Sequence, residues 1–214
     1  FFQISEALSR QFCICYYHIM EYQINNLSSK IIAGLERICE AYNVLLWKKA
    51  KLLGLSTIQI QILIFANYHD ITLCNVSHLA KEFNITKPTV SDAVRVLLKK
   101  ELVTKVFPSS DSRSYGIQLT KSGHDIVKDT EHFAQPIKQQ IDLLDKKQQE
   151  DLFKSITQLI YKLNQVDVLS VQRMCLNCRF YRKDGKDSFC NLLETKLKTS
   201  DVRIDCDEFQ LKNV

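Results

Sequence analysis

The stretch "NVSHLAKEFNITKPTVSDAVRVLLKK" (residues 75–100) decides the fold, because it contains two helix starts separated by a short turn. Asn75 can cap a short first helix. Thr86 can cap a second helix, in which Pro88 is tolerated in the first turn. The core side of this second helix is expected to consist of Val90, Val94, Leu97 and Leu98. Two helices joined in this way are typical of a helix-turn-helix.

The neighbouring segments extend this pattern to a winged helix. Upstream, Ser56 and Gln59 carry the signature of a capping box at the start of a further helix. Downstream, "LVTKVF" and "YGIQLT" have a β-like pattern, and the polar "PSSDSR" between them predicts a hairpin. Residues 56–120 therefore predict a winged helix-turn-helix, mainly α with a small β-hairpin. In this fold the second helix of the turn enters the major groove of DNA.

Positive charge is concentrated in the same block. Residues 85–121 hold seven basic and three acidic side chains. This excess of four positive charges accounts for most of the net charge of +5. Phosphate attraction needs such a local field. The DNA-contacting side chains predicted on the second helix are Lys87, Thr89, Ser91, Asp92, Arg95 and Lys99. We expect Arg113, at the hairpin tip, to enter the minor groove and Asp111 to pair with it and order the wing. The alternative is a solvated basic face on a winged helix that binds protein.

These residues resemble the MarR family of bacterial regulators over roughly residues 25–166. The family's marks are Leu79-Ala80, Pro88 to Ser91, Leu102-Val103, Asp111 with Arg113, and Leu119-Thr120 with Gly123. The sequence departs from the family where Glu101 replaces the usual glycine and where Ser114 stands in place of a second arginine.

The resemblance implies an obligate homodimer that binds double-stranded DNA at a palindromic operator and represses transcription. In this family the terminal helices interleave, and a small-molecule effector can lie between them and the winged domain; no residues here single out an effector. Apolar residues recur at helical spacing within 4–19, 24–45, 126–144 and 152–166, and we expect them to form the dimer surface.

Composition excludes several other classes. The chain is 45% hydrophobic and 25% charged, with five Gly and three Pro, as expected for a helical globular protein. It has no apolar run near the roughly 20 residues that span a bilayer and no signal-peptide layout. We therefore expect a cytoplasmic protein with no membrane partner and with reduced thiols. Because phosphate loops, nucleophile elbows and zinc-protease motifs are all lacking, we predict no enzyme and no catalytic residues.

Four cysteines near the end of the chain form a second motif: Cys175, Cys178, Cys190 and Cys206. The C-x-x-C pair can direct both sulfurs to one centre, and two further thiols complete a four-thiolate set. This number suits both a structural zinc ion and a [4Fe–4S] cluster. Only one C-x-x-C knuckle is present, whereas structural zinc sites often use two.

The segment around these thiols favours the cluster. It combines apolar residues, which would bury a cluster, with Arg179 and Arg182, which would offset its negative charge. Its spacing and the ending "DCDEF" resemble the small iron–sulfur subunits of glycyl-radical decarboxylases and benzylsuccinate synthase. We therefore predict a [4Fe–4S] cluster, with one structural Zn as the alternative and plain or disulfide-linked cysteines as a third reading. The other cysteines and the five scattered histidines are predicted to be packing or surface residues. The resemblance to the MarR family leaves oxidation-sensing thiols as the alternative for Cys13 and Cys15.

These predictions divide the chain into four parts. Residues 1–54 and 122–167 form dimerisation helices, 55–121 form the winged helix, and 168–214 form the four-cysteine tail. The tail either makes the regulator responsive to redox state or iron, or acts as a metal staple for a segment too small to bury much core. A different function class is an accessory subunit that carries a cluster or zinc for a larger enzyme, or a protein-interaction module.

Overall fold

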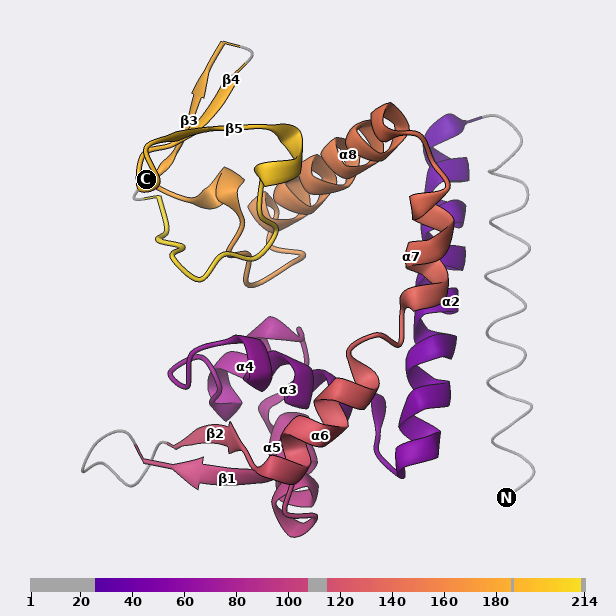
Figure 1. The fold of residues 1–214 in the computed structure, drawn as a ribbon, viewed down its shortest axis with the longest axis vertical. Coiled ribbons are helices and arrows are strands. Elements are labelled where there is room, and N and C mark those ends of the chain that lie inside the picture. The colour runs from indigo at the N-terminus through magenta and orange to yellow at the C-terminus, as the bar shows by residue number, and fades with distance from the viewer. Residues whose placement is uncertain (1–25, 108–114, 186, 213–214) are drawn as a thin grey trace. The chain divides into compact units, whose positions relative to one another are not determined.

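The computed structural model describes residues 26–107, 115–185 and 187–212, and the chain forms two compact units, Phe1–Lys49 and Ala50–Val214. The described helices are α2 (Leu27–Leu53), α3 (Thr57–Tyr68), α4 (Val76–Glu82), α5 (Lys87–Lys99), α6 (Lys121–Thr130), α7 (Gln135–Asp142) and α8 (Lys146–Gln165) (Figure 1). The described strands are β1 (Val103–Val106), β2 (Gly116–Leu119), β3 (Tyr181–Asp184), β4 (Asp187–Cys190) and β5 (Thr195–Leu197).

The predicted helix starts are confirmed. Ser56 and Gln59 form a reciprocal capping box at the start of α3. The side chain of Asn75 accepts the His78 N–H at the start of α4, at 2.9 Å. Thr86 caps α5, with Pro88 in its first turn. Each of these side chains satisfies a backbone donor that the helix itself leaves unpaired.

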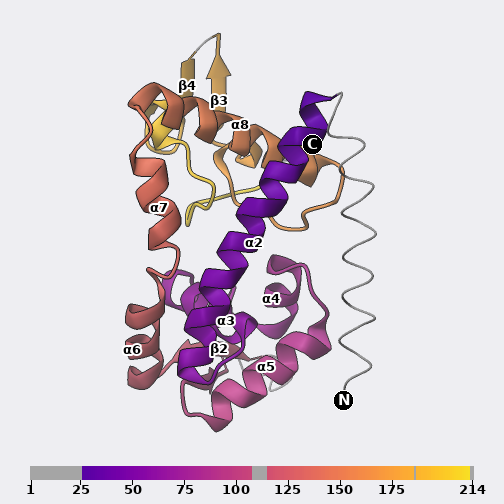
Figure 2. The same cartoon turned by 90° about the vertical axis from the view of Figure 1, so that its right-hand side faces the viewer.

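The core of the winged helix lies where α3, α4 and α5 meet. The following side chains have no exposed surface: Ile60, Ile62, Leu63, Leu79, Val90, Val94 and Leu97. Each contributes about 1.5–3 kcal/mol of burial free energy. Leu98, predicted for this core, is only half-buried. Figure 2 shows α3, α5, α6 and β2 gathered in this part of the molecule.

The two strands of the predicted hairpin are confirmed. β1 and β2 are antiparallel, with Val103 opposite Leu119 and Val106 opposite Gly116. Ile117 is only 1% exposed and packs into the core, and its N–H donates to the Cys74 carbonyl at 2.8 Å. The connecting residues 108–114 lie outside the described part of the chain. The hairpin is thus fixed to the start of α4 by both packing and backbone hydrogen bonding.

The segment after the hairpin differs from its prediction. We predicted one continuous apolar stripe over 126–144, but α6 ends at Thr130 and α7 begins at Gln135. Pro136 in the first turn of α7 explains the break, because proline inside a continuous helix would remove a backbone hydrogen bond and clash with the preceding turn. Among the described residues no single helix is long and apolar enough to cross a membrane; only the pair α2 and α3, bent by 92°, has that length and composition together.

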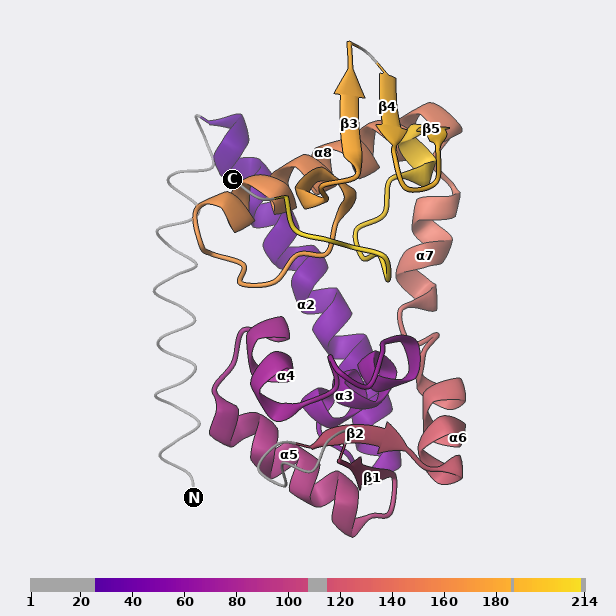
Figure 3. The same ribbon diagram turned by 90° about the vertical axis from the view of Figure 1, so that its left-hand side faces the viewer.

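The C-terminal tail folds into a small sheet that the sequence did not indicate. β3, β4 and β5 form a three-stranded antiparallel sheet in that order, and Figure 3 shows it beyond α8. The buried residues of the described tail are Met174, Asn177, Cys178 and Leu197. So small a core contributes little burial free energy, and the tail depends on other contacts for its stability.

Candidate functional sites

The exposed side of α5 carries the predicted DNA-contacting residues. Each of Lys87, Thr89, Ser91, Asp92, Arg95 and Lys99 is exposed. The opposite side of the helix is fully buried at Val90, Val94 and Leu97. α5 is therefore held firmly along one side and presents cations and short polar groups along the other.

Two of these side chains have partners within α5. Thr89 shares a hydrogen bond of 2.8 Å with the capping Thr86, so part of its hydrogen-bonding capacity serves the helix start. Arg95 pairs with Asp92 one turn earlier, with both side chains largely exposed. An exposed pair of this kind contributes only about 0–1 kcal/mol, so Arg95 can leave Asp92 for a phosphate at little cost.

The loop end of the two wing strands is ordered by aromatic contacts. Phe107 and Tyr115 pack edge to face with ring centroids 6.1 Å apart. The Lys105 ammonium lies 4.3 Å from the Tyr115 ring centroid, in cation–π geometry. A cation is thus held near the loop end of the hairpin strands. Arg113 and Asp111, predicted at the wing tip, lie outside the described residues.

Glu101 connects α5 to the wing in an unusual conformation. Its φ is 56°, in the left-handed region that glycine adopts without strain. The Glu101 N–H donates to the Leu98 carbonyl, and the Leu102 N–H donates to the Leu97 carbonyl, both at 3.0 Å. This is the hydrogen-bond pattern of a helix end that usually carries glycine.

Comparison with known proteins bears on this part of the chain. Residues 53–114 match the family model described as MarR family. The winged helix is MarR-like.

Solved structures agree on the MarR-like fold. The S. aureus MepR–DNA complex is 23% identical with a TM-score of 0.53, and the match covers 61% of this chain and 97% of that chain. Streptococcus pneumoniae FabT in complex with DNA is 23% identical with a TM-score of 0.54, covering 65% and 99%. A MarR protein from Peptoclostridium difficile is 20% identical with a TM-score of 0.54, covering 66% and 92%. None of the curated protein sequences compared with the chain matches it.

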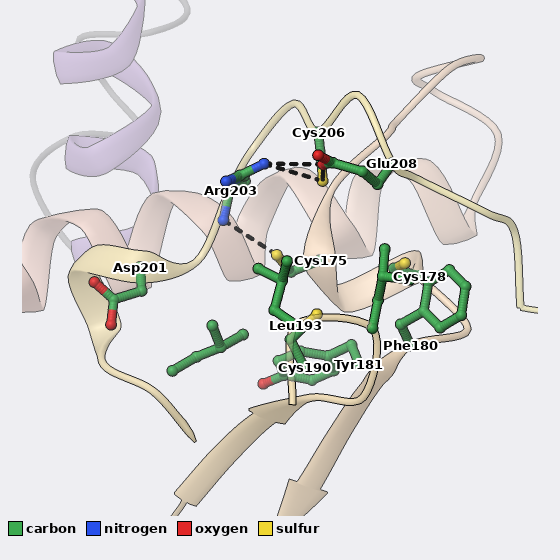
Figure 4. Close-up of a pocket in the computed structure, with 12 residues that line it drawn as sticks. Cys175, Cys178, Phe180, Tyr181, Cys190, Leu193, Asp201, Arg203, Cys206 and Glu208 are labelled. Atoms are coloured by element: carbon green, nitrogen blue, oxygen red, sulfur yellow. Dashed lines mark hydrogen bonds and ion pairs between the residues drawn. The ribbon is translucent and has the colours of Figure 1, made fainter. Parts of the chain in front are cut away.

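The four tail cysteines line one pocket, with an empty volume of about 450 Å³ that is partly open to solvent. Cys175 lies in a 3-10 turn and Cys178 follows it, Cys190 ends β4, and Cys206 lies in the last loop. Figure 4 shows their sulfur atoms facing this pocket. The remaining lining is mostly apolar: Phe180, Tyr181, Leu192, Leu193 and Leu197, with Asp201, Arg203 and Glu208 at the edge.

Arg203 connects two of the thiols. Its backbone N–H donates to the Cys175 sulfur at 3.2 Å, and its guanidinium lies 3.6 Å from the Cys206 sulfur (Figure 4). Burial raises the pKa of the Cys175 thiol, although the Arg203 N–H counteracts this. Burial also raises the pKa of Cys206, and its hydrogen bond to Glu208 adds to the effect. Arg203 is placed to stabilise thiolates at this pocket once the protons leave.

The donor set of the pocket fits a thiolate-bound metal. All four thiols are free, and four sulfurs match the number that zinc or a cubane cluster takes. Among the described residues, no three His, Cys, Asp or Glu side chains have an arrangement that could hold a metal ion as they stand. Binding would therefore require the sulfurs to move closer together within the pocket.

Sequence reasoning missed an ionic cluster centred on the buried Arg173 side chain. The Arg173 guanidinium donates to both carboxylate oxygens of Asp205, at 2.8 and 3.0 Å, and to Glu82 of α4 at 2.7 Å. His69, just after α3, contacts Asp205 at 2.7 Å. The Arg173 side chain is only 9% exposed. The only signal in the sequence was the position of Arg173 and Asp205 next to cysteines.

Proposed function

We propose that the protein is a DNA-binding transcription regulator of MarR type that acts as a homodimer. The observation that carries the proposal is α5, the second helix of a helix-turn-helix, with a fully buried apolar side and an exposed side that carries Lys87, Arg95 and Lys99. Lysine and arginine in this position suit contacts to phosphate and to base edges. Two structures with the same fold, those of MepR and FabT, are complexes with DNA.

Exposed apolar side chains support the homodimer. Large apolar residues of α2 and α8 lie open in the single chain: Leu27, Ile31, Ile32, Leu35, Ile38, Leu152, Ile156 and Leu159. Within each helix these side chains recur at helical spacing, and an exposed apolar stripe of this kind favours an interface. A second copy would cover it and relate two α5 helices by a two-fold axis. Operator half-sites would then lie about 34 Å apart, or one helical turn, in a palindrome.

The same architecture supports repression. A dimer that binds a duplex through two α5 helices and two wings can block a promoter by occupancy alone. Activation would require a further surface that recruits another protein. We therefore infer that the protein is a repressor.

We further propose that Cys175, Cys178, Cys190 and Cys206 hold a metal centre, a [4Fe–4S] cluster with one zinc ion as the alternative. Their common pocket, its apolar lining and the nearby Arg203 support this. Metal binding would displace the thiol protons and add the cross-link that the small tail core lacks. A cluster would make the regulator responsive to redox state or iron.

Selection of random-sequence duplexes by the purified full chain tests DNA binding. The proposal expects enrichment of a palindrome whose half-sites are one helical turn apart, and sedimentation of the free protein as a dimer. Failure to enrich any sequence at low salt would refute regulation through DNA, and a monomer at micromolar concentration would refute the dimer.

Metal analysis of anaerobically purified protein tests the four-cysteine centre. A brown protein with four irons and four sulfides indicates the cluster, and a colourless protein with one zinc indicates the alternative. Cys190→Ser should lower the bound metal strongly. Cys39→Ser is the matched control, because Cys39 is exposed and lies outside the pocket. Equal metal loss in both variants, or no metal in the wild type, would contradict the centre.

A further inference from the structure

The described part of the tail is joined to the winged helix by polar contacts at three points. The first is the Arg173 clamp, which we define as Arg173, Asp205, Glu82 and His69. The other two join Asn84, in the turn between α4 and α5, to the first residues of the tail. Ser170 donates to the Asn84 side chain at 2.8 Å, and the Asn84 amide donates to the Val168 carbonyl at 3.4 Å.

Arg173 is the buried centre of the clamp, and Asp205 lies partly exposed beside it. The Arg173–Asp205 pair is bidentate, a geometry that gives the strongest protein ion pairs. The guanidinium carbon also lies 5.4 Å from the centroid of the Phe65 ring, which stacks on His69. Burial opposes the charge of Asp205, but hydrogen bonds from Arg173 and His69 outweigh this and lower its pKa. Loss of either carboxylate would leave the poorly solvated Arg173 charge less well compensated, so we expect the contacts of the clamp to form and separate together.

Both tail residues of the clamp are close neighbours of cysteines in the pocket. Arg173 precedes Cys175 by two residues, and Asp205 directly precedes Cys206. The two segments run side by side, since the Cys175 N–H donates to the Arg203 carbonyl at 3.0 Å. A metal that binds Cys175 and Cys206 together would therefore also fix Arg173 against Asp205.

The opposite side of the tail is attached to α8. Asn177, inside the C-x-x-C turn, is 7% exposed and donates to the Asn164 side chain at 2.9 Å. Its side-chain oxygen accepts from Gln165 at 3.5 Å. The tail thus has polar contacts to α8 through Asn177 and to the helix-turn-helix through Arg173 and Asp205.

We propose that the four-cysteine tail is a metal-dependent strut between α8 and the helix-turn-helix, and that the Arg173 clamp transmits metal loading to α3 and α4. The inference rests on the proposed function. With metal bound, the tail is ordered and the clamp holds the ends of α3 and α4 in one orientation. Without metal, the small tail core opens locally more often, and the clamp separates in that fraction of the molecules. The spacing of the two α5 helices on DNA then changes.

The test compares operator affinity of metal-loaded and metal-stripped protein at one salt concentration. Loading uses Zn²⁺ alone, or Fe²⁺ and Fe³⁺ with sulfide under anaerobic conditions. For the wild type we expect the two affinities to differ by about tenfold, within the usual range of allosteric coupling. In Glu82→Ala this ratio should fall below about threefold while bound metal per chain stays unchanged, because Glu82 does not line the pocket.

Asp125→Ala is the matched control, because it removes the same charge from an exposed i,i+3 pair on α6 and has no described contact with the tail. It should keep the wild-type ratio. Ser170→Ala, a milder change, should lower the ratio without endangering the fold. A Glu82→Ala ratio equal to that of the wild type, or a wild-type ratio of one, would overturn the strut.

Hydrogen exchange separates failure of the strut from failure of the proposed function. Metal should slow amide exchange in residues 76–83 of the wild type by roughly tenfold or more, and not in Glu82→Ala. If the wild type shows this protection but binds no duplex, the strut stands and regulation through DNA fails. If it binds DNA with no metal-dependent protection, the strut fails and the DNA-binding proposal stands.

Discussion

Glu101→Gly should stabilise the protein, although it deletes a side chain. Glu101 has a φ of 56° at the end of α5, where a Cβ is strained. Placing an ordinary residue in this left-handed conformation costs about 1–2 kcal/mol. Glycine removes that strain but loses about 0.5–1 kcal/mol through the extra freedom of the unfolded chain. We therefore expect a net gain of about 0.5–1 kcal/mol, or roughly 1–4 °C in melting temperature for a chain of this size.

The assay is urea unfolding at fixed protein concentration, with Glu101→Ala as the matched control. Both variants remove the same charge, but alanine keeps the Cβ and its strain. Gly54→Ala is the reverse test, because Gly54 has a φ of 61° after α2 and an added Cβ would meet only the Lys100 ammonium, at 4.0 Å. It should lose about 1 kcal/mol. If Glu101→Ala stabilised the protein as much as Glu101→Gly, backbone strain would not be the cause.

Three further predictions concern buried positions. Gly123→Ala should cost about 2–3 kcal/mol in urea unfolding, because its Cβ would lie 2.1 Å from the backbone oxygen of Leu102, which also accepts a hydrogen bond from Thr120. Burial raises the pKa of the Cys74 thiol to about 11. As pH rises from 9 to 11, the Cys74 thiol ionises in the unfolded chain before it ionises in the folded protein. The free energy of unfolding should therefore fall by at most about 2–3 kcal/mol over this interval. Cys74→Ala should remove this contribution to the loss of stability at alkaline pH. Asn177→Ala should speed amide exchange in residues 172–180 by at least fivefold without changing exchange in α5, because it breaks the contacts between the tail and α8.

Local signals in the sequence were enough to predict the winged helix. Ser56, Asn75 and Thr86 cap helices through contacts made within three residues, so their positions in the sequence predict the helix starts. The spacing of Val90, Val94 and Leu97 likewise predicted the buried side of α5. The break between α6 and α7 could have been found from Pro136, but the apolar spacing across it suggested one helix.

The tail and the clamp could not be predicted in this way. The Arg173 clamp joins residues 69, 82, 173 and 205, which only the folded chain brings together. The strands of the tail are three or four residues long, too short for a clear alternating pattern. The common pocket of the four cysteines agrees with the C-x-x-C spacing, whereas the metal itself stays a prediction.

The salt dependence of DNA binding tests the central claim most directly. Fluorescence anisotropy of a labelled palindromic duplex from the selection is measured from 50 to 300 mM salt, for the wild type and for Lys99→Ala. Each phosphate contact contributes about −0.9 to the slope of log affinity against log salt. We expect a steep wild-type slope, which becomes shallower by about 2 in a Lys99→Ala dimer if each copy loses one contact. A slope near zero in the wild type, or affinity indifferent to Lys99, would contradict the placement of α5 on DNA.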